Sequence, residues 1–357
     1  MNSTQKIFAW CVFLALFIWG FYELRDVLLP FVAGIAIAYF LDPLTTKLQQ
    51  KLHSRTAALL IVFSALIIVF LLCVLIVVPI VEKQLMTFIS NLPMYAALLW
   101  DKIEPFLFEM KRLFPTQMDN LRDSIAEHMS GGLKIVLSTV QRILSGSVAI
   151  LNLLSLLLVT PIVAFYLLRD WEKFCAVIKK LLPREEAKTI RSLLRQMNDI
   201  ISGFIRGQAT VCLFLGIFYA VGLSLAGLDL GLLLGLGIGM LSFIPYVGST
   251  LGFIMSVSLA VVQFNDWKRV AVIIVIFFLG QMLEGNVLTP KLVGEKVGLH
   301  PVWVMFALLT GAALFGFLGV LIAVPVAAII GVLVRFGVQK YLESPLYLGT
   351  PKSDVTE

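Results

Sequence analysis

The stretch LGLLLGLGIGMLSFIPYVGSTLGFIMSVSLAVVQFN, Leu230 to Asn265, holds 36 residues without a charge. As one helix it would be about 54 Å long, whereas the hydrocarbon core of a bilayer is about 30 Å thick. The chain must therefore turn back within this stretch. Pro245 and Gly248 mark the turn, because neither residue favours a helix interior. The sequence predicts a hairpin of two short apolar helices, with Pro245, Tyr246 and Gly248 at its tip.

A second stretch, Val297 to Val334, has 38 residues without Asp, Glu, Lys or Arg and is also too long for one span. A break is visible at GFLGV, which begins at Gly316, and Pro325 follows it. We expect a second hairpin, with Gly316, Gly319 and Pro325 at its tip. Lipid cannot satisfy the backbone N–H and C=O groups freed at such tips, so both tips should face protein or a wet cavity.

The two regions match each other at an offset of 71 residues, which predicts an internal repeat. GLDL at Gly227 matches GLHP at Gly298, and Gly248 matches Gly319. One apolar spanning segment precedes each hairpin, and these segments are Gly207 to Leu228 and Val270 to Leu283. Each unit crosses the membrane an odd number of times, so we expect the second copy to be inverted. Inverted repeats with broken helices are typical of secondary transporters, whose solute site lies between the repeats.

The composition agrees with a membrane location, since 59% of the residues are hydrophobic and only 14% are charged. Soluble domains have about 25% charged residues. We therefore predict an all-α integral membrane protein with about eight transmembrane helices, two re-entrant or broken helical hairpins in an inverted repeat, and long helices projecting outside and into the cytoplasm. The expected divisions are a three-span region (1–81), an extracytoplasmic helical segment (82–142), a fourth span with a cytoplasmic amphipathic helix (143–206), two repeat units (207–266 and 267–340) and a polar tail (341–357).

The distribution of Lys and Arg predicts the orientation. The loop 42–55 has three basic residues against one acid, and 169–206 has nine against five, so both are expected in the cytoplasm. The segment 82–142 is balanced, seven against seven, and is expected outside, which leaves both termini in the cytoplasm. Most of the net charge of +6 lies beside spans, so it favours membrane orientation over nucleic-acid binding.

Helical patterns extend beyond the membrane. Apolar residues recur at helical spacing in the outer segment until Pro115, and again from Leu133 into the span that ends at Leu168. On the cytoplasmic side we expect a helix from Pro183 through Gly207. Its apolar stripe consists of Ile190, Leu193, Leu194, Met197, Ile200, Ile201, Phe204 and Ile205. The stripe could cover the protein's own loops, another subunit or the anionic inner leaflet, and the sequence does not choose among them.

Small residues and the rare polar groups have simple interpretations. Gly231, Gly235 and Gly239 recur every four residues, a pattern that lets helix backbones approach closely. The four cysteines form no CxxC pair, and His53 and His128 lie in polar loops away from ligand or triad spacing. No phosphate-binding GxxxxGK[ST] occurs. We therefore expect no enzyme activity, no metal and no cofactor.

The passage EGNVLTPKLVGEKVGLHP, Glu284 to Pro301, is unusually polar for its position. It follows fourteen uncharged residues, and its Gly and Pro predict an unwound segment. An acid this deep in a membrane is a functional candidate by default. The predicted solute or ion pathway consists of Gln281, Glu284, Asn286, Lys291 and His300. The rival interpretation is a cytoplasmic loop in which Glu284 caps a helix and pairs with Lys291 for structure alone.

Several long motifs resemble the autoinducer-2 exporter family of bacterial permeases. They are FYLLRD at Phe165, IPYVG at Ile244, the passage from Glu284 to Pro301, and GFLGVLIAVP at Gly316. The resemblance covers nearly the whole chain. It implies a bacterial cytoplasmic-membrane protein that forms homo-oligomers, with a pentamer as the first guess, in a family associated with export of autoinducer-2 and, for some members, with sodium/proton antiport.

Three functions stay open at this point. The first is export of a small polar solute similar to autoinducer-2, and the second is cation/proton antiport that uses a membrane carboxylate. The third is a membrane scaffold without transport. An ionisable acid inside the membrane separates the first two, and Glu284 is the candidate, whereas Asp229 and Asp266 lie at span ends.

Overall fold

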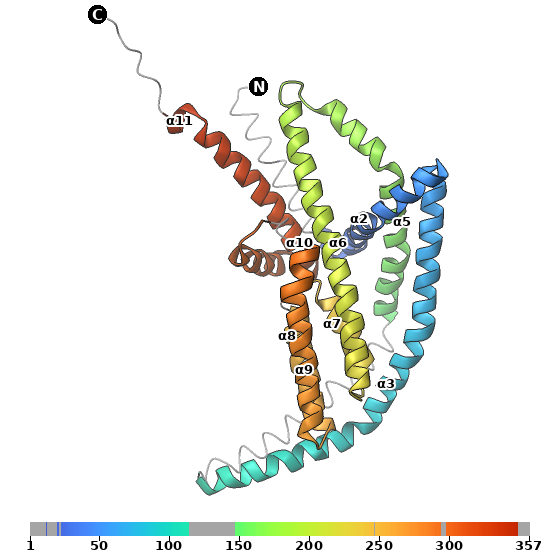
Figure 1. Ribbon diagram of the computed structural model, residues 1–357, viewed down its shortest axis with the longest axis vertical. Helices are drawn as coiled ribbons and strands as arrows, with labels where there is room; N and C mark the ends of the chain where they lie inside the picture. Colours follow the sequence, from blue (N-terminus) through green and yellow to red (C-terminus); the bar gives the residue numbers. More distant parts are fainter. Residues whose placement is uncertain are drawn as a thin grey trace, which may run out of the picture. The chain divides into compact units, whose positions relative to one another are not determined.

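The computed structural model describes residues 12, 20, 23–113, 147–245, 247–293 and 298–348. Within these ranges every regular element is a helix and no strand occurs, which confirms the all-α prediction. The helices in chain order are α2 (Arg25–Leu52), α3 (Arg55–Leu113), α5 (Ser147–Leu181), α6 (Ala187–Leu225), α7 (Gly231–Leu241), α8 (Val247–Gln263), α9 (Trp267–Leu283), the π-helix η1 (Glu284–Val293), α10 (Pro301–Leu342) and α11 (Pro345–Leu348) (Figure 1).

Long apolar helices make this a multi-pass membrane protein. Among the described residues, five helices are long and apolar enough to span a bilayer. These segments are Val27–Leu52, Arg55–Tyr95, Ala187–Leu225, Trp267–Val293 and Pro301–Leu342. Two shorter apolar helices, α7 and α8, accompany them. The expected total of about eight spans stays a prediction.

The long helices follow the sequence patterns with one shift. α3 continues into the predicted outer segment, 82–142, and ends at Leu113, just before Pro115. It bends along its length (Figure 1), and it contains prolines at 79, 93 and 105, which weaken helix hydrogen bonding. α6 runs through Gly207 without interruption, as expected, but it begins at Ala187 and not at Pro183, because residues 184–186 form a separate turn. The expected helix start at Leu133 lies outside the described residues.

The chain divides into two compact units. Unit 1 contains Met1–Val62, Leu157–Gln208 and Pro290–Glu357. Unit 2 contains Phe63–Leu156 and Ala209–Thr289. The first hairpin therefore lies in unit 2, and the second hairpin lies in unit 1.

In unit 2, the first predicted hairpin consists of α7 and α8, which pack against each other. α7 ends where the backbone N–H and the hydroxyl of Ser242 both donate to the carbonyl of Ile238, each at 2.8 Å. Pro245 lies in the turn that follows. Gly248 is buried in the first turn of α8, and a Cβ there would come within 3.0 Å of the Ser242 backbone. The close approach of the two helices therefore needs glycine at position 248.

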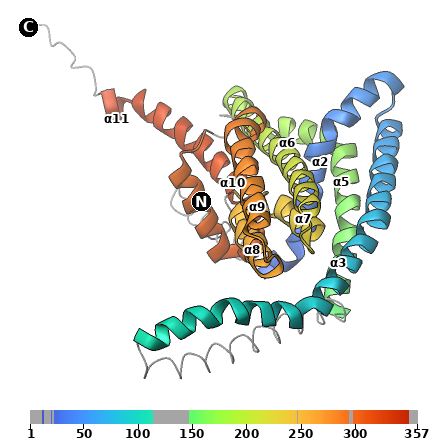
Figure 2. The same cartoon turned by 60° about the horizontal axis from the view of Figure 1, so that its bottom comes forward.

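In unit 1, the second hairpin lies within α10. Gly316 has φ 58° and ψ −137°, which interrupts the helix. A Cβ on Gly319 would come within 3.0 Å of the Gly311 backbone, although eight residues of straight helix would separate these glycines by about 12 Å. The chain therefore folds back at Gly316, and Figures 1 and 2 draw α10 as two limbs that meet at an angle.

The two hairpins share local geometry around Gly227 and Gly298, which the 71-residue offset matches, although the side chains that bind their carbonyls, Gln263 and Arg335, are 72 residues apart. Gly227 and Gly298 both have positive φ, 79° and 57°, immediately before the first limb. At the end of the second limb, Gln263 Nε2 donates to the Gly227 carbonyl at 2.9 Å. Arg335 Nη1 donates to the Gly298 carbonyl at 3.3 Å in the other hairpin. This equivalence supports the internal repeat with observations that the sequence match did not use.

Candidate functional site

Glu284 lies where α9 passes into the π-helix η1, inside the candidate span Trp267–Val293. Its side chain is half-buried and accepts a hydrogen bond from Gln281 Nε2 at 3.3 Å. Glu284 also interacts electrostatically with Cys212 and Tyr219 of α6. A carboxylate within an apolar span is costly unless it is paired or hydrated. The structure therefore places Glu284 and Gln281 together as the centre of the candidate site.

The backbone at Glu284 differs from the expectation. The prediction of an unwound passage is wrong for Glu284–Val293, because the chain continues as a ten-residue π-helix. Pro290 lacks a backbone N–H, and in an α-helix its ring would collide with the carbonyl four residues earlier. The wider π turn moves that carbonyl away from the ring. π-helical turns are rare and frequent at functional sites, and most are shorter than this one.

The end of η1 packs closely on α6 within unit 1. Gly207 is buried, and a Cβ there would come within 3.0 Å of the backbone of Leu292. Val293, the last residue of η1, is 8% exposed. The absence of a side chain at position 207 therefore allows the α6 backbone to touch the π-helix.

Tyr219 of α6 contributes a phenol to the candidate site. The residue is 0% exposed, and its ring stacks on Phe277 of α9 with the centroids 4.8 Å apart. A Cβ on Gly280 would come within 3.0 Å of the Tyr219 hydroxyl, so glycine leaves room for it. Among the described residues the hydroxyl has no partner in normal hydrogen-bond geometry, a state that costs about 1–3 kcal/mol. Tyr219 was not among the site residues predicted from the sequence. A phenol inside an uncharged span could have identified it as a candidate.

The remaining predicted pathway residues lie farther along the chain. Asn286 is exposed on η1 in unit 2. Lys291 is exposed near the end of η1, and His300 is exposed at the start of α10, both in unit 1. The Nδ1 atom of His300 accepts a hydrogen bond from the backbone N–H of Val302 at 3.4 Å. His300 thus caps α10, and a role of these three side chains in a pathway stays a prediction.

The predicted tip residues occupy different places. Pro245 lies in the first turn and Gly316 at the second reversal, whereas Tyr246 lies outside the described residues. Gly248 and Gly319 follow the reversals, where they contact the opposite limb. Pro325 lies well inside the second limb of α10.

The glycine pattern of α7 provides a backbone contact with α6. Gly231, Gly235 and Gly239 are all buried. A Cβ on Gly235 would come within 3.0 Å of the Ala220 backbone, and one on Gly239 would reach the backbone of Gly216. A Cβ on Gly237 would meet no described atom within 4 Å. Gly231, Gly235 and Gly239 thus lie on the face of α7 that contacts α6.

A cluster of polar side chains closes the open end of the first hairpin. Tyr95 of α3 is 4% exposed and donates its O–H to Asp229, which follows the α6 helix. Asn91 Nδ2 and Gln263 Nε2 also donate to the Asp229 carboxylate, at 3.3 Å and 3.0 Å. Gln84 Oε1 accepts the backbone N–H of Leu233 in the first turn of α7, at 3.4 Å. This cluster, Gln84, Asn91, Tyr95, Asp229 and Gln263, is the hairpin clasp.

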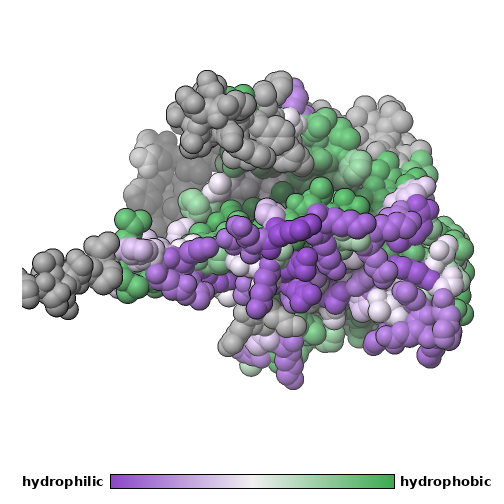
Figure 3. Space-filling view, turned by 90° about the horizontal axis from the view of Figure 1, so that it is seen from above, coloured by the Kyte–Doolittle hydropathy of each residue, from purple (hydrophilic) through white to green (hydrophobic). Residues whose placement is uncertain are grey.

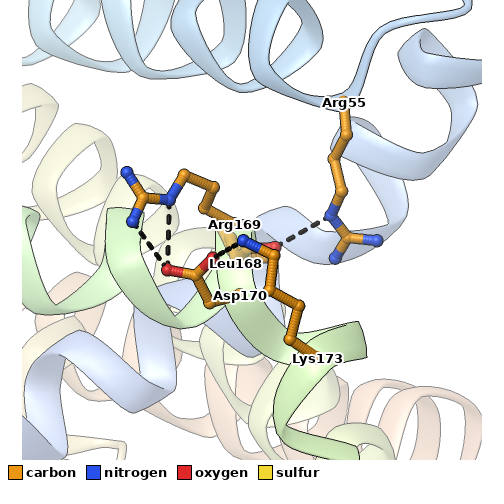
Figure 4. Close-up of polar contacts among 5 residues, drawn as sticks. All are labelled: Arg55, Leu168, Arg169, Asp170 and Lys173. Atoms are coloured by element: carbon orange, nitrogen blue, oxygen red, sulfur yellow. Dashed lines mark hydrogen bonds and ion pairs between the residues drawn. The ribbon is translucent and has the colours of Figure 1, made fainter. Parts of the chain in front are cut away.

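Two arginines of unit 1 bind backbone carbonyls of neighbouring helices. Arg55, at the start of α3, donates Nε to the Leu168 carbonyl at 2.9 Å (Figure 4). It also forms an ion pair with Glu172. Arg206 of α6 donates Nε to the Tyr39 carbonyl at 2.9 Å and Nη2 to Asp42 at 3.3 Å. Arginine suits these contacts because its planar guanidinium offers several N–H donors in a fixed geometry. These contacts join the ends of four helices within the unit.

The FYLLRD motif ends in a charged group beside Arg55. Arg169 donates to Asp170 at 2.7 Å, and Lys173 pairs with Asp170 at 3.0 Å (Figure 4). The hydrogen bond from Arg169, with the one from Lys173, lowers the pKa of Asp170 to about 2. The Arg169 guanidinium also lies over the Tyr166 ring, 4.6 Å from its centroid. Hydrophilic residues gather in a band on the face shown in Figure 3.

Asp266 has a structural role. It caps α9, and its carboxylate accepts the backbone N–H of Lys268 at 2.9 Å. Within the described ranges, no group of three or more His, Cys, Asp or Glu side chains is arranged to hold a metal ion.

Comparisons with known proteins agree with the membrane architecture. A protein-family model described as "AI-2E family transporter" matches residues 11–339. The chain is 28% identical over 310 residues to "Putative transport protein YrrI" of Bacillus subtilis, a match that covers 87% of this chain and 86% of the relative. It is 29% identical over 310 residues to "Putative permease PerM" of Escherichia coli K12, with 85% of each chain covered.

Proposed function

Because the chain belongs to the AI-2E family of transporters and not to a family of enzymes, we propose that it is a secondary transporter that exports a small polar solute similar to autoinducer-2. We place it in the bacterial cytoplasmic membrane, as the E. coli relative suggests. The observation that carries the proposal is the half-buried carboxylate of Glu284 inside the span Trp267–Val293. An ionisable group at such a position marks a solute or ion pathway in many membrane proteins.

The internal repeat supports this function. Both hairpins begin after a glycine with positive φ, and a side chain from the second limb binds that glycine's carbonyl in each. We propose that the second copy is inverted in the membrane, with both termini and the segment 169–206 in the cytoplasm and the segment 82–142 outside. Inverted repeats allow alternating access, because one copy can adopt the conformation of the other.

The decisive test is flux in proteoliposomes that contain the purified protein, with imposed proton and sodium gradients. Autoinducer-2 and Na⁺ serve as separate probes. Glu284→Gln should assemble as the wild type does and lose gradient-driven flux, and Asn286→Ala should weaken it. Wild-type flux with unchanged pH dependence in Glu284→Gln would show that the passage is only a connector.

The second candidate is cation/proton antiport, which the same carboxylate favours because it can exchange a proton for a cation. Na⁺ flux that follows an imposed pH gradient, without movement of autoinducer-2, would select antiport. If neither probe moves in either direction, the transport proposal falls and the scaffold function takes its place. We also propose a homo-oligomer, with a pentamer expected, and native mass spectrometry would give its subunit number.

A further inference from the structure

Tyr219 is a buried polar group to which the proposed transport gives no role. Its side chain is 0% exposed, yet its hydroxyl has no partner in normal hydrogen-bond geometry among the described residues. Phe277 stacks on one face of the ring, and Gly280 lies beneath the hydroxyl with no room for a Cβ. The phenol is therefore fixed with its oxygen against α9, one helical turn before Glu284. Leaving a buried donor unpaired is unfavourable, so this hydroxyl is a candidate for a partner that the described conformation does not supply.

Gln281 is the side chain that can reach both groups. Its Nε2 donates to Glu284 Oε2 at 3.3 Å, which is long for such a bond. Gln281 directly follows Gly280, against which the Tyr219 hydroxyl packs, and its contact with that hydroxyl lies outside normal hydrogen-bond geometry. Gln281 is exposed and so can change its rotamer, and its amide oxygen can accept a phenolic O–H.

We propose that Tyr219 is the second partner of Gln281, and that Gln281 turns from Glu284 to Tyr219 when a cation or a solute hydroxyl binds the carboxylate. This inference rests on the proposed transport function. In the conformation described here Gln281 covers Glu284 and Tyr219 is unpaired. In the loaded state the ligand replaces Gln281 on Glu284, and Tyr219 receives the displaced amide. Tyr219 is thus a positioning residue, which acts on Glu284 through Gln281.

The test measures concentration-dependent flux in proteoliposomes, with whichever of autoinducer-2 and Na⁺ the wild type carries. Tyr219→Phe removes one oxygen atom and keeps the ring stacked on Phe277. It should raise the half-saturating concentration about tenfold and leave the maximal rate unchanged, since only the loaded state loses a hydrogen bond. Tyr341→Phe, at a 53% exposed tyrosine, is the matched control and should change neither quantity.

A double-mutant comparison separates positioning from packing. In a Gln281→Ala background, Tyr219→Phe should have no further effect, because its partner is already absent. Gly280→Ala, which crowds the Tyr219 hydroxyl, is a second variant and should raise the half-saturating concentration in the same way. An unchanged value in Tyr219→Phe, or an equal rise with and without Gln281, would overturn the inference and leave the transport function intact. Absence of wild-type flux with both probes would overturn both.

Discussion

Gln263 donates a hydrogen bond to the carbonyl oxygen of Gly227 at 2.9 Å, and so ties the end of the first hairpin to its beginning. Arg335 does the same for Gly298 at 3.3 Å in the second hairpin. Each bond holds a carbonyl that a positive-φ glycine turns away from the helix. The two hairpins therefore use different side chains for the same contact.

Gln263→Ala should loosen the first hairpin, and Arg335→Ala the second. Each variant loses one hydrogen bond to a carbonyl, or about 1 kcal/mol of the free energy of unfolding. Hydrogen exchange should rise locally, next to Gly227 in one variant and next to Gly298 in the other. Gln339→Ala, which removes an exposed contact with Glu343, is the control. Equal exchange in all three variants would contradict the equivalence of the two contacts.

Tyr95→Phe should release the hairpin clasp. The O–H of Tyr95 is the buried donor to Asp229. Loss of one hydrogen bond to a charged carboxylate should lower the free energy of unfolding by about 1.5–3 kcal/mol. The midpoint of thermal unfolding in detergent should fall, and the Leu233 amide should exchange faster. Tyr347→Phe, at an exposed tyrosine, should leave both quantities unchanged. A Tyr95→Phe protein as stable as the wild type would show that the clasp contributes nothing.

Three glycines of α7 give a matched series. Gly235→Ala and Gly239→Ala place a Cβ against the α6 backbone, which cannot move away as a flexible side chain could. Each should destabilise the protein by about 1–3 kcal/mol. Gly237→Ala meets nothing within 4 Å and should be neutral, or stabilising by up to about 1 kcal/mol through helix propensity. Thermal unfolding of the three variants checks this order, and an equal loss at position 237 would refute it.

Gly316→Ala should destabilise the second hairpin through the backbone alone. No atom lies within 4 Å of a Cβ there, but φ 58° with ψ −137° is a conformation that only glycine adopts readily. The expected cost is about 1–3 kcal/mol. Gly337→Ala also meets open space, without a positive φ, and serves as the control. Similar unfolding midpoints for the two variants would argue against a backbone origin.

The pairing of Asp170 predicts a pH dependence. Its pKa is lowered from 3.8 to about 2, so its contribution to stability is present at neutral pH and is lost as the pH falls from about 4 through 2. The stability difference between the wild type and Asp170→Asn should be constant above about pH 5 and vanish near pH 2. The difference is small because the group is exposed to solvent. Denaturation curves over this pH range measure the stability difference. A difference that persists at pH 2 would show that the Asp170 charge is not its cause.

Sequence reasoning found the features that depend on nearby residues. Pro245 and Gly316 break stretches that are too long for one span, and the structure has its reversals there. The proposed repeat rests on GLDL and GLHP, whose first glycines both have positive φ in the structure. The clasp was not predicted, since Tyr95 and Asp229 are 134 residues apart and nothing local relates them.

The π-helix was missed for a different reason. Gly285 and Pro290 show that an α-helix is disfavoured after Glu284, but they do not show which other backbone the chain adopts. Tyr219 was missed because a single phenol in an apolar helix has no spacing pattern. Its importance depends on Gly280 and Gln281, which belong to another helix.

The π-helix after Glu284 also has a rotational consequence. A π-helix and an α-helix differ only in which carbonyl each N–H selects, the fifth or the fourth before it. Exchange of one π turn for an α turn breaks no covalent bond, yet it turns the residues that follow in the same helix by about one residue, or about 100° around the axis. Val293, at the far end of η1, would then turn away from its buried position, whereas Glu284, its first residue, would not. The number of π turns between these two residues therefore sets the angle between them around the helix axis.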